Sequence, residues 1–144
     1  MTTPAPSLTA QANNFNWLVN RFAGDTAGII AAIAVSADGL LIAASSGIGG
    51  ANAERLGAIS TAMLSLANGV ADCHPIGTPD KIVIELSYGY LLVCTIRPGC
   101  LLGVLASKPA SLGTLAYEMA MFANRAGPSL TPGLIEELKR NIQI

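Results

Sequence analysis

Two apolar runs joined by an Asp-Gly pair place the strongest constraint on this fold. The run Ile29–Ser36 is followed by Asp38-Gly39 and by a second apolar run over residues 40–45. Glycine tolerates the positive φ that a tight turn needs, so this pattern predicts an antiparallel β-hairpin. Because both runs are apolar at nearly every position, both faces of the sheet that contains them must be covered.

The remaining pattern predicts helices and further strands in a fixed order. Asn13 or Asn14 is a candidate cap for a first amphipathic helix, and Asn52 is one for a long helix over residues 52–71. Three strands joined by tight turns follow, at residues 81–87, 90–96 and 101–107, and then helices at residues 112–126 and from Pro132, with Thr131 as cap. We therefore predict an α/β (α+β) fold with the order α-β-β-α-β-β-β-α plus a short C-terminal helix.

The chain of 144 residues is expected to form one domain. Residues 1–12 are rich in Thr, Pro, Ala and Ser and are predicted to be a disordered tail. The domain itself is predicted over residues 13–127, with residues 128–144 as a C-terminal helical extension.

The long helix has more apolar surface than one buried face requires. One stripe holds large side chains, and a second holds mostly small ones. The large stripe is Leu56, Ile59, Met63, Leu66 and Val70, and the small stripe is Ala53, Gly57, Ser60, Leu64, Ala67 and Ala71. We expect the large stripe to cover the sheet and the small stripe to admit a second copy of the helix across a two-fold axis. The alternative is that an alanine-rich face is simply exposed, since alanine is the best helix former.

Composition favours a protein partner. Hydrophobic residues make up 51% of the chain and charged residues only 12%, so some apolar surface should be covered by another chain. The net charge of −1, without a basic stripe, argues against nucleic acid. The most apolar stretch is far shorter than the roughly 20 residues that span a bilayer, so no membrane insertion is predicted. Three cysteines without Cys-x-x-Cys spacing fit reduced thiols and a cytoplasmic location.

Catalytic patterns are weak. His74 directly follows Cys73, and neighbouring side chains are poorly placed to act as nucleophile and base. The histidine and the dispersed cysteines fit no zinc spacing, and the carboxylates occur singly. Gly47-Ile48-Gly49-Gly50 lacks the Gly-Lys-Ser/Thr of a phosphate loop. We predict no catalytic residue, no metal and no cofactor.

Three segments resemble the bacterial branch of the Roadblock/dynein light chain domain family. They are Phe15-Asn16-Trp17-Leu18-Val19-Asn20-Arg21-Phe22, the hairpin Ala34-Val35-Ser36-Ala37-Asp38-Gly39-Leu40-Leu41-Ile42-Ala43, and Tyr117-Glu118-Met119-Ala120. The resemblance covers residues 13–126. It implies a five-stranded antiparallel sheet sandwiched by helices, a Roadblock/profilin-like arrangement in which the long helix alone covers one face.

Family members pair through the long helix and the edge strand after it, so the resemblance implies a homodimer. The interface residues that it indicates here are Ala53, Leu56, Gly57, Ser60, Met63, Leu64, Ala67, Ala71, Ile82 and Ile84. A related Roadblock chain as the partner is an open alternative.

The resemblance also implies a function in signalling. Family members bind Ras-like small GTPases or act as scaffold and motor subunits, and the similar actinobacterial members accompany a sensor-kinase-like protein. A gliding-motility relative activates its GTPase without an arginine finger, and we do not assign that role to Arg55. The implied partner surface is Glu54, Arg55, Ala58 and Ala62. A structural scaffold is the alternative, and a ligand sensor is disfavoured because the strands offer few polar groups for a pocket.

Overall fold

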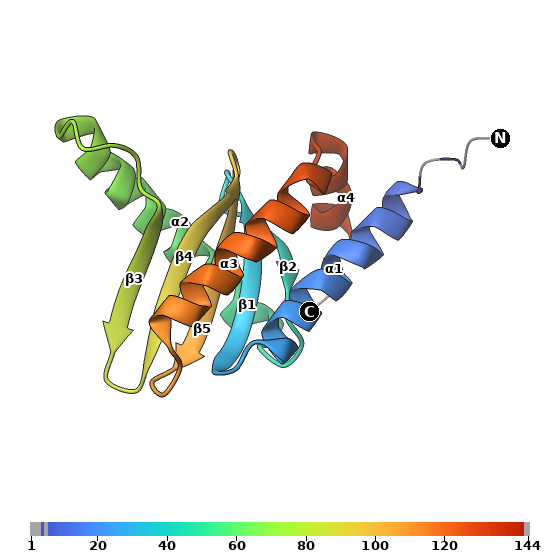
Figure 1. Cartoon of the computed structure of the whole chain (residues 1–144). Helices are drawn as coiled ribbons and strands as arrows, with labels where there is room; N and C mark the ends of the chain where they lie inside the picture. The colour runs from blue at the N-terminus through green and yellow to red at the C-terminus, as the bar shows by residue number, and fades with distance from the viewer. Residues whose placement is uncertain (1–3, 5, 143–144) are drawn as a thin grey trace.

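A computed structural model describes residues 4 and 6–142, and in this part of the chain one five-stranded antiparallel sheet lies between helices (Figure 1). The elements are α1 (Leu8–Asp25), β1 (Ile29–Ser36), β2 (Leu41–Ala44), α2 (Gly50–Cys73), β3 (Lys81–Leu86), β4 (Gly89–Arg97), β5 (Cys100–Ser107), α3 (Leu112–Ala126), a 3₁₀ turn (Gly127–Ser129) and α4 (Pro132–Arg140). The strands run in the order β2-β1-β5-β4-β3. The predicted fold class and element order are confirmed.

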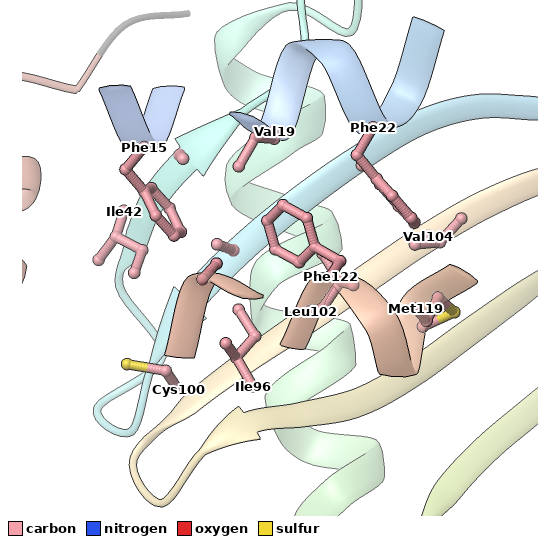
Figure 2. Close-up of a cluster of buried hydrophobic side chains, with 14 of the residues drawn as sticks. Phe15, Val19, Phe22, Ile42, Ile96, Cys100, Leu102, Val104, Met119 and Phe122 are labelled. Atoms are coloured by element: carbon pink, nitrogen blue, oxygen red, sulfur yellow. The ribbon is translucent and has the colours of Figure 1, made fainter. Parts of the chain in front are cut away.

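Helix α2 covers one face of the sheet, and α1, α3 and α4 cover the other (Figure 1). The three-helix side holds the larger core. There Phe122 of α3 packs between two rings of α1, with its centroid 6.3 Å from that of Phe15 and 5.1 Å from that of Phe22 (Figure 2). Buried side chains of the sheet, such as Leu102 and Val104, form the floor beneath these rings. Burial of both sheet faces explains the nearly continuous apolar strands.

The first helix begins earlier than the sequence pattern predicts. Helix α1 starts at Leu8, and Ser7 is its cap, because the Ser7 hydroxyl accepts a hydrogen bond from the Ala10 amide at 3.1 Å. Ala12 is buried in the core, and α4 packs against this end of the fold. The predicted tail is therefore wrong for residues 8–12, where tertiary contacts outweigh composition; its residues 1–3 and 5 lie outside the described residues.

The C-terminal segment is part of the core. Helix α4 starts at Pro132 with Thr131 as cap, as predicted. Leu130, Leu134 and Leu138 have essentially no exposed surface and belong to the same cluster as the α1 and α3 phenylalanines. The Arg97 guanidinium also donates a hydrogen bond of 2.7 Å to the Leu130 carbonyl. The boundary predicted at residue 127 is therefore wrong, because the last helix closes the domain core.

The long helix spans more of the chain than the residues 52–71 predicted for it. Helix α2 begins at Gly50 and ends at Cys73. Its cap is Gly49, with φ of +81°, and not Asn52. A residue with a side chain is strained at that φ, which gives this glycine a structural role.

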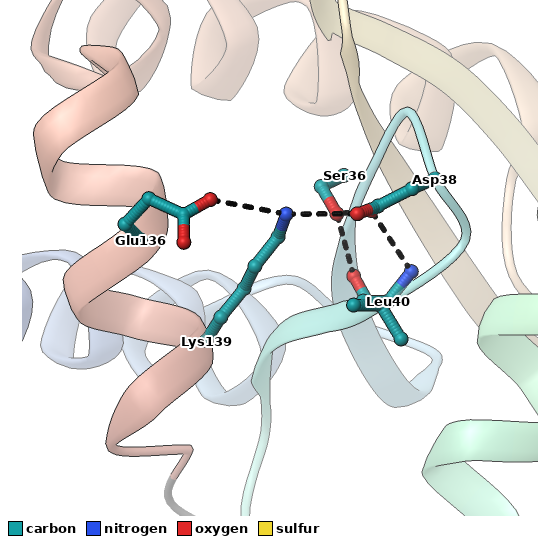
Figure 3. A network of polar contacts seen from close by, with 5 residues as sticks. All are labelled: Ser36, Asp38, Leu40, Glu136 and Lys139. Atoms are coloured by element: carbon teal, nitrogen blue, oxygen red, sulfur yellow. Dashed lines mark hydrogen bonds and ion pairs between the residues drawn. The ribbon is translucent and has the colours of Figure 1, made fainter.

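The β1–β2 turn is fastened to α4 by a polar network (Figure 3). The Ser36 hydroxyl donates a hydrogen bond to Asp38, and Lys139 Nζ lies 3.0 Å from the other Asp38 oxygen and 3.4 Å from Glu136. These contacts, the Ser36 hydrogen bond first, lower the pKa of Asp38 from 3.8 to about 2. Glu136 and Lys139 come from α4, so the network joins segments about one hundred positions apart in sequence.

We expect Asp38→Asn to alter the acid dependence of stability. A carboxyl group whose pKa is lowered by folding stabilises the protein above its unfolded pKa, and that contribution disappears as the pH falls through its folded pKa. The wild type should have a larger free energy of unfolding than Asp38→Asn above pH 4. This difference should reach its maximum there and should shrink as the pH falls towards 2. Urea unfolding between pH 2 and pH 6 measures it, with Asp80→Asn as the control outside the network. A difference that does not change with pH would contradict the assignment.

Candidate protein-interaction surface

Helix α2 packs on the sheet through small side chains, the reverse of the orientation that its two stripes predict. Ala53, Gly57 and Ser60 are buried, together with Leu56. Beneath them lie large side chains of the sheet, including Ile33, Val35 and Leu101. The prediction that the large stripe covers the sheet is wrong, and four predicted dimer residues, Ala53, Leu56, Gly57 and Ser60, contact their own sheet instead.

Steric crowding explains this orientation. A Cβ placed on Gly103 of β5 would lie 2.8 Å from the Ser60 hydroxyl and 3.1 Å from Cγ1 of Ile33. The Ser60 hydroxyl donates a hydrogen bond of 2.8 Å to the carbonyl of Leu56 one turn earlier, so it is satisfied within the helix. Because the sheet already supplies the bulk on this side, the helix must supply small residues for the two to pack closely.

We expect Gly103→Ala to reduce the free energy of unfolding by about 1–3 kcal/mol, because its Cβ would overpack the α2–sheet contact. Gly69→Ala in α2 is the matched control. Nothing lies within 4 Å of a Cβ at that position, so this change should stabilise the helix by roughly 0.5–1 kcal/mol. Chemical denaturation of both variants measures the contrast. Equal effects would show that α2 does not pack closely on β5.

The outward side of α2 is apolar and uncovered. Ile59 is 43% exposed, Leu66 66% and Val70 55%, and these positions fall on one flank of the helix. Met63 is half-buried on the same flank. Among the remaining predicted dimer residues, Leu64, Ala67 and Ala71 are half-buried along the inner margin of the helix. Several large apolar side chains exposed together on one flank of a surface helix are typical of a protein-binding site.

Strand β3 adds an open sheet edge. In the described chain β3 pairs with β4 only, so its second row of backbone N–H and C=O groups has no strand partner. The opposite edge strand, β2, contacts α1 and α4. Ile82 and Ile84 of β3 are half-buried and pack against the core on the α2 side, while Val83 is 41% exposed. An uncovered edge of this kind is a template for pairing with another chain.

We call the combination the α2–β3 surface: Ile59, Met63, Leu66 and Val70 of α2 with the free edge of β3. In Figure 1 the C-terminal part of α2, in green, projects past the sheet beside β3. The sequence reading found the two elements and Met63, Ile82 and Ile84, but it missed Ile59, Leu66 and Val70. A signal for the correct orientation of α2 was present in the sequence of β5, which α2 contacts. That strand holds several leucines and one glycine, Gly103, and this pattern indicates that a helix packs closely on it.

The residues predicted to bind a further partner lie on solvent-facing turns of α2. Glu54, Arg55, Ala58 and Ala62 are all exposed. Glu54 also lines a shallow hollow of about 420 Å³ with Leu40 and Lys139, next to the β1–β2 turn. The structure thus brings these residues together on one side, and nothing in their geometry tests the role predicted for them.

Helix α2 is also long and apolar enough to cross a membrane by length and composition alone. Its inner face packs on the sheet, so leaving the sheet would expose the apolar cluster around Ile33 and Val35. That cost favours the packed arrangement over a spanning one.

The residues considered for catalysis do not assemble into a site. Cys73 and His74 are exposed at the end of α2. Burial raises the pKa of Cys94 to about 11 and that of Cys100 above its usual value, so both hold their protons at neutral pH. Across residues 4 and 6–142, no three His, Cys, Asp or Glu side chains gather to hold a metal ion. The loop at residues 47–50 connects β2 to α2, with Gly47 and Gly49 at positive φ.

Comparison with known proteins identifies relatives of this arrangement. The Roadblock/LC7 domain model matches residues 15–106. The crystal structure of a Roadblock/LC7 domain from Streptomyces avermitilis is similar over 80% of this chain and 96% of its own, with 28% identity and a TM-score of 0.74. MglB from Myxococcus xanthus shares the fold, with 14% identity and a TM-score of 0.70 over 89% of this chain and 97% of its own. Profilin from Schizosaccharomyces pombe also shares it, with 16% identity and a TM-score of 0.60 over 81% of this chain and 98% of its own. No curated protein matched the sequence.

Proposed function

The chain belongs to the Roadblock/LC7 family, and on that premise we propose that it is a non-enzymatic, homodimeric regulator or adaptor that binds a Ras-like small GTPase in a bacterial signalling module. The observation that carries the proposal is the α2–β3 surface, an apolar helix flank beside an unpaired strand edge. Such a surface is built for another protein chain, not for a small ligand.

The occupant that fits the β3 edge is a second copy of the chain. Two β3 strands related by a two-fold axis can pair antiparallel, which extends the sheet across both copies and satisfies the free backbone groups. The same axis brings the two α2 flanks together, where Leu66 and Val70 lose their exposure to water. One MglB structure is described as having a tetrameric arrangement, which supports self-association in this fold.

The GTPase would bind the solvent-facing turns of the paired α2 helices, around Glu54, Arg55, Ala58 and Ala62. Small apolar residues flanked by an acidic and a basic side chain offer a flat surface with two charges that can select a partner. A sensor-kinase-like protein is a further partner of the same module. We place the protein in the cytoplasm, with recruitment to the membrane by its partners.

The alternative function is a scaffold that assembles other proteins without reading a nucleotide state. The same α2–β3 surface serves both functions. The two are distinguished by whether the affinity for a GTPase depends on its bound nucleotide.

Calorimetric titration with the Ras-like GTPase encoded nearest to the gene, loaded with GDP or a non-hydrolysable GTP analogue, tests the proposal. A preference for the GTP form supports a regulator, and equal affinity supports the scaffold. The double charge reversal Glu54→Arg/Arg55→Glu should weaken binding about tenfold or more through lost charge complementarity. Arg21→Asp/Asp25→Arg, on α1 across the sheet, is the control, because it swaps the two members of an exposed ion pair and leaves the net charge unchanged. Unchanged binding by the α2 variant would refute the assigned surface.

A further inference from the structure

The three-helix side of the molecule carries a groove of about 460 Å³ between α1 and α3. It is separated from the α2–β3 surface by the whole thickness of the sheet (Figure 1). A dimer formed through α2 and β3 would therefore leave one such groove open on each copy.

The groove has an aromatic floor and an apolar rim. Its floor is formed by Phe22 and Phe122, whose rings are nearly fully buried. On the rim, Trp17 is 53% exposed and Met121 38%. Tryptophan and methionine are enriched at the centres of protein interfaces, and a half-exposed tryptophan beside a methionine has no role in the core beneath it.

The exposed indole is held in place before any partner arrives. The Arg21 guanidinium carbon lies 5.1 Å from the centroid of the Trp17 ring, and Arg21 Nε lies 3.1 Å from Asp25 Oδ2. The ion pair along α1 thus supports the cation that covers one face of the ring. A side chain ordered in advance loses less conformational entropy when it becomes an interface contact.

Charge divides the groove into two ends. Helices α1 and α3 run in opposite directions over the sheet (Figure 1), so Glu118 lies towards Asp25 and Thr26, and Arg125 lies towards Trp17. Arg21 is already paired with Asp25, so Glu118 supplies the remaining negative charge at one end and Arg125 supplies the positive charge at the other. An occupant with the reverse distribution of charge would match both ends.

We propose that the α1–α3 groove binds an amphipathic helix of a partner protein, with acidic residues near Arg125 and basic residues near Glu118. The α1 part of the groove runs from Trp17 to Thr26, about 14 Å at 1.5 Å per residue, which accommodates two to three helical turns. Leucine or a similar residue at i, i+3/i+4 and i+7 of that helix meets Trp17, Phe22 and Met121. The binding depends on neither dimerisation nor the GTPase.

The test uses the single tryptophan of the chain as its own reporter. The probes are three synthetic 14-residue peptides with the same leucine stripe on an alanine background. One carries two Glu at one end and two Lys at the other, one carries Glu at both ends, and one carries Lys at both ends. Titration into the full-length protein should shift the Trp17 emission to shorter wavelength, with the Glu/Lys peptide binding about tenfold tighter than the others.

Variants of the protein distinguish specific binding in the groove from non-specific hydrophobic binding of the peptides. Met121→Glu should abolish the shift, and Glu118→Arg should make the all-Glu peptide the tightest binder. Asp72→Arg, at an exposed position of α2 across the sheet from the groove, makes the same change of charge as Glu118→Arg and should bind as the wild type does. Equal affinity for the three peptides, no shift with any of them, or a shift that survives Met121→Glu would overturn the proposal. The titration contains no GTPase, so a negative result would contradict the groove proposal without bearing on the proposed function.

Discussion

Replacing Leu134 with alanine is expected to lower the free energy of unfolding by about 2–5 kcal/mol. Leu134 lies in α4 and has no exposed surface, within the same cluster as Phe15 and Phe122. Truncation removes apolar contacts and leaves a cavity that the surrounding helices and sheet cannot fully close. An effect of this size would remove much of the stability of a domain, which is typically about 5–15 kcal/mol.

Urea denaturation followed by circular dichroism measures this loss, with Leu112→Ala as the matched control. Leu112 is 37% exposed at the start of α3, so its truncation should lower stability by only about 1 kcal/mol. If Leu134→Ala behaves like the control, α4 does not belong to the cooperative core of the domain. A large cooperative loss shows that α4 unfolds with the rest of the domain.

Leu66→Glu is expected to convert the proposed homodimer into a folded monomer. Leu66 is the most exposed large residue on the outward flank of α2, and pairing through the α2–β3 surface would bury it. A carboxylate introduced there must lose its hydration in the interface, and two-fold symmetry places two copies in each dimer. Dimer affinity should fall on the order of 100-fold or more, the size of an interface hot-spot effect.

Sedimentation equilibrium over a range of concentrations measures the change, and circular dichroism checks that the fold is retained. Leu112→Glu introduces the same charge on the other side of the sheet and should remain dimeric. Two results would refute the proposed interface: a wild type that is monomeric throughout, or a Leu66→Glu variant with wild-type association.

Helix α4 and the α2–β3 surface both concern how the apolar side chains of this chain are covered. Hydrophobic residues make up 51% of the chain, and several large ones stay exposed on the folded domain. Helix α4 covers part of the apolar surface at the β2 edge and over the three-helix core. The flank of α2 beside β3 remains uncovered, and the proposed dimer interface lies there.

Local sequence was sufficient for the elements and their order. The Asp38-Gly39 turn predicts the first hairpin, and Gly39 indeed has φ of +82°. Thr131-Pro132 predicts the start of the last helix, which the Thr131 cap confirms. These features depend on short-range geometry, such as a positive φ or a capping hydroxyl, and the residues concerned are adjacent in the chain.

The tertiary structure decided which side of α2 faces the sheet. The helix alone offers two apolar stripes, and a large one is the usual choice for a core. The volume available beneath it depends on Ile33, Val35 and Gly103, which come from other strands. Because interiors are filled to a nearly constant density, large sheet residues require small helix residues, and Ile59, Leu66 and Val70 of the large stripe stay exposed.

Tertiary contacts also decided where the domain begins and ends. Residues 8–12 carry a weak local signal, and the Thr131-Pro132 signal does not say where the last helix packs, yet α1 and α4 pack against each other and Lys139 reaches the Asp38 turn. The sequence by itself determined what each segment becomes, through turn, cap and periodicity. Only the tertiary structure decided which surfaces meet, because packing depends on the volumes and charges of residues far apart in the chain.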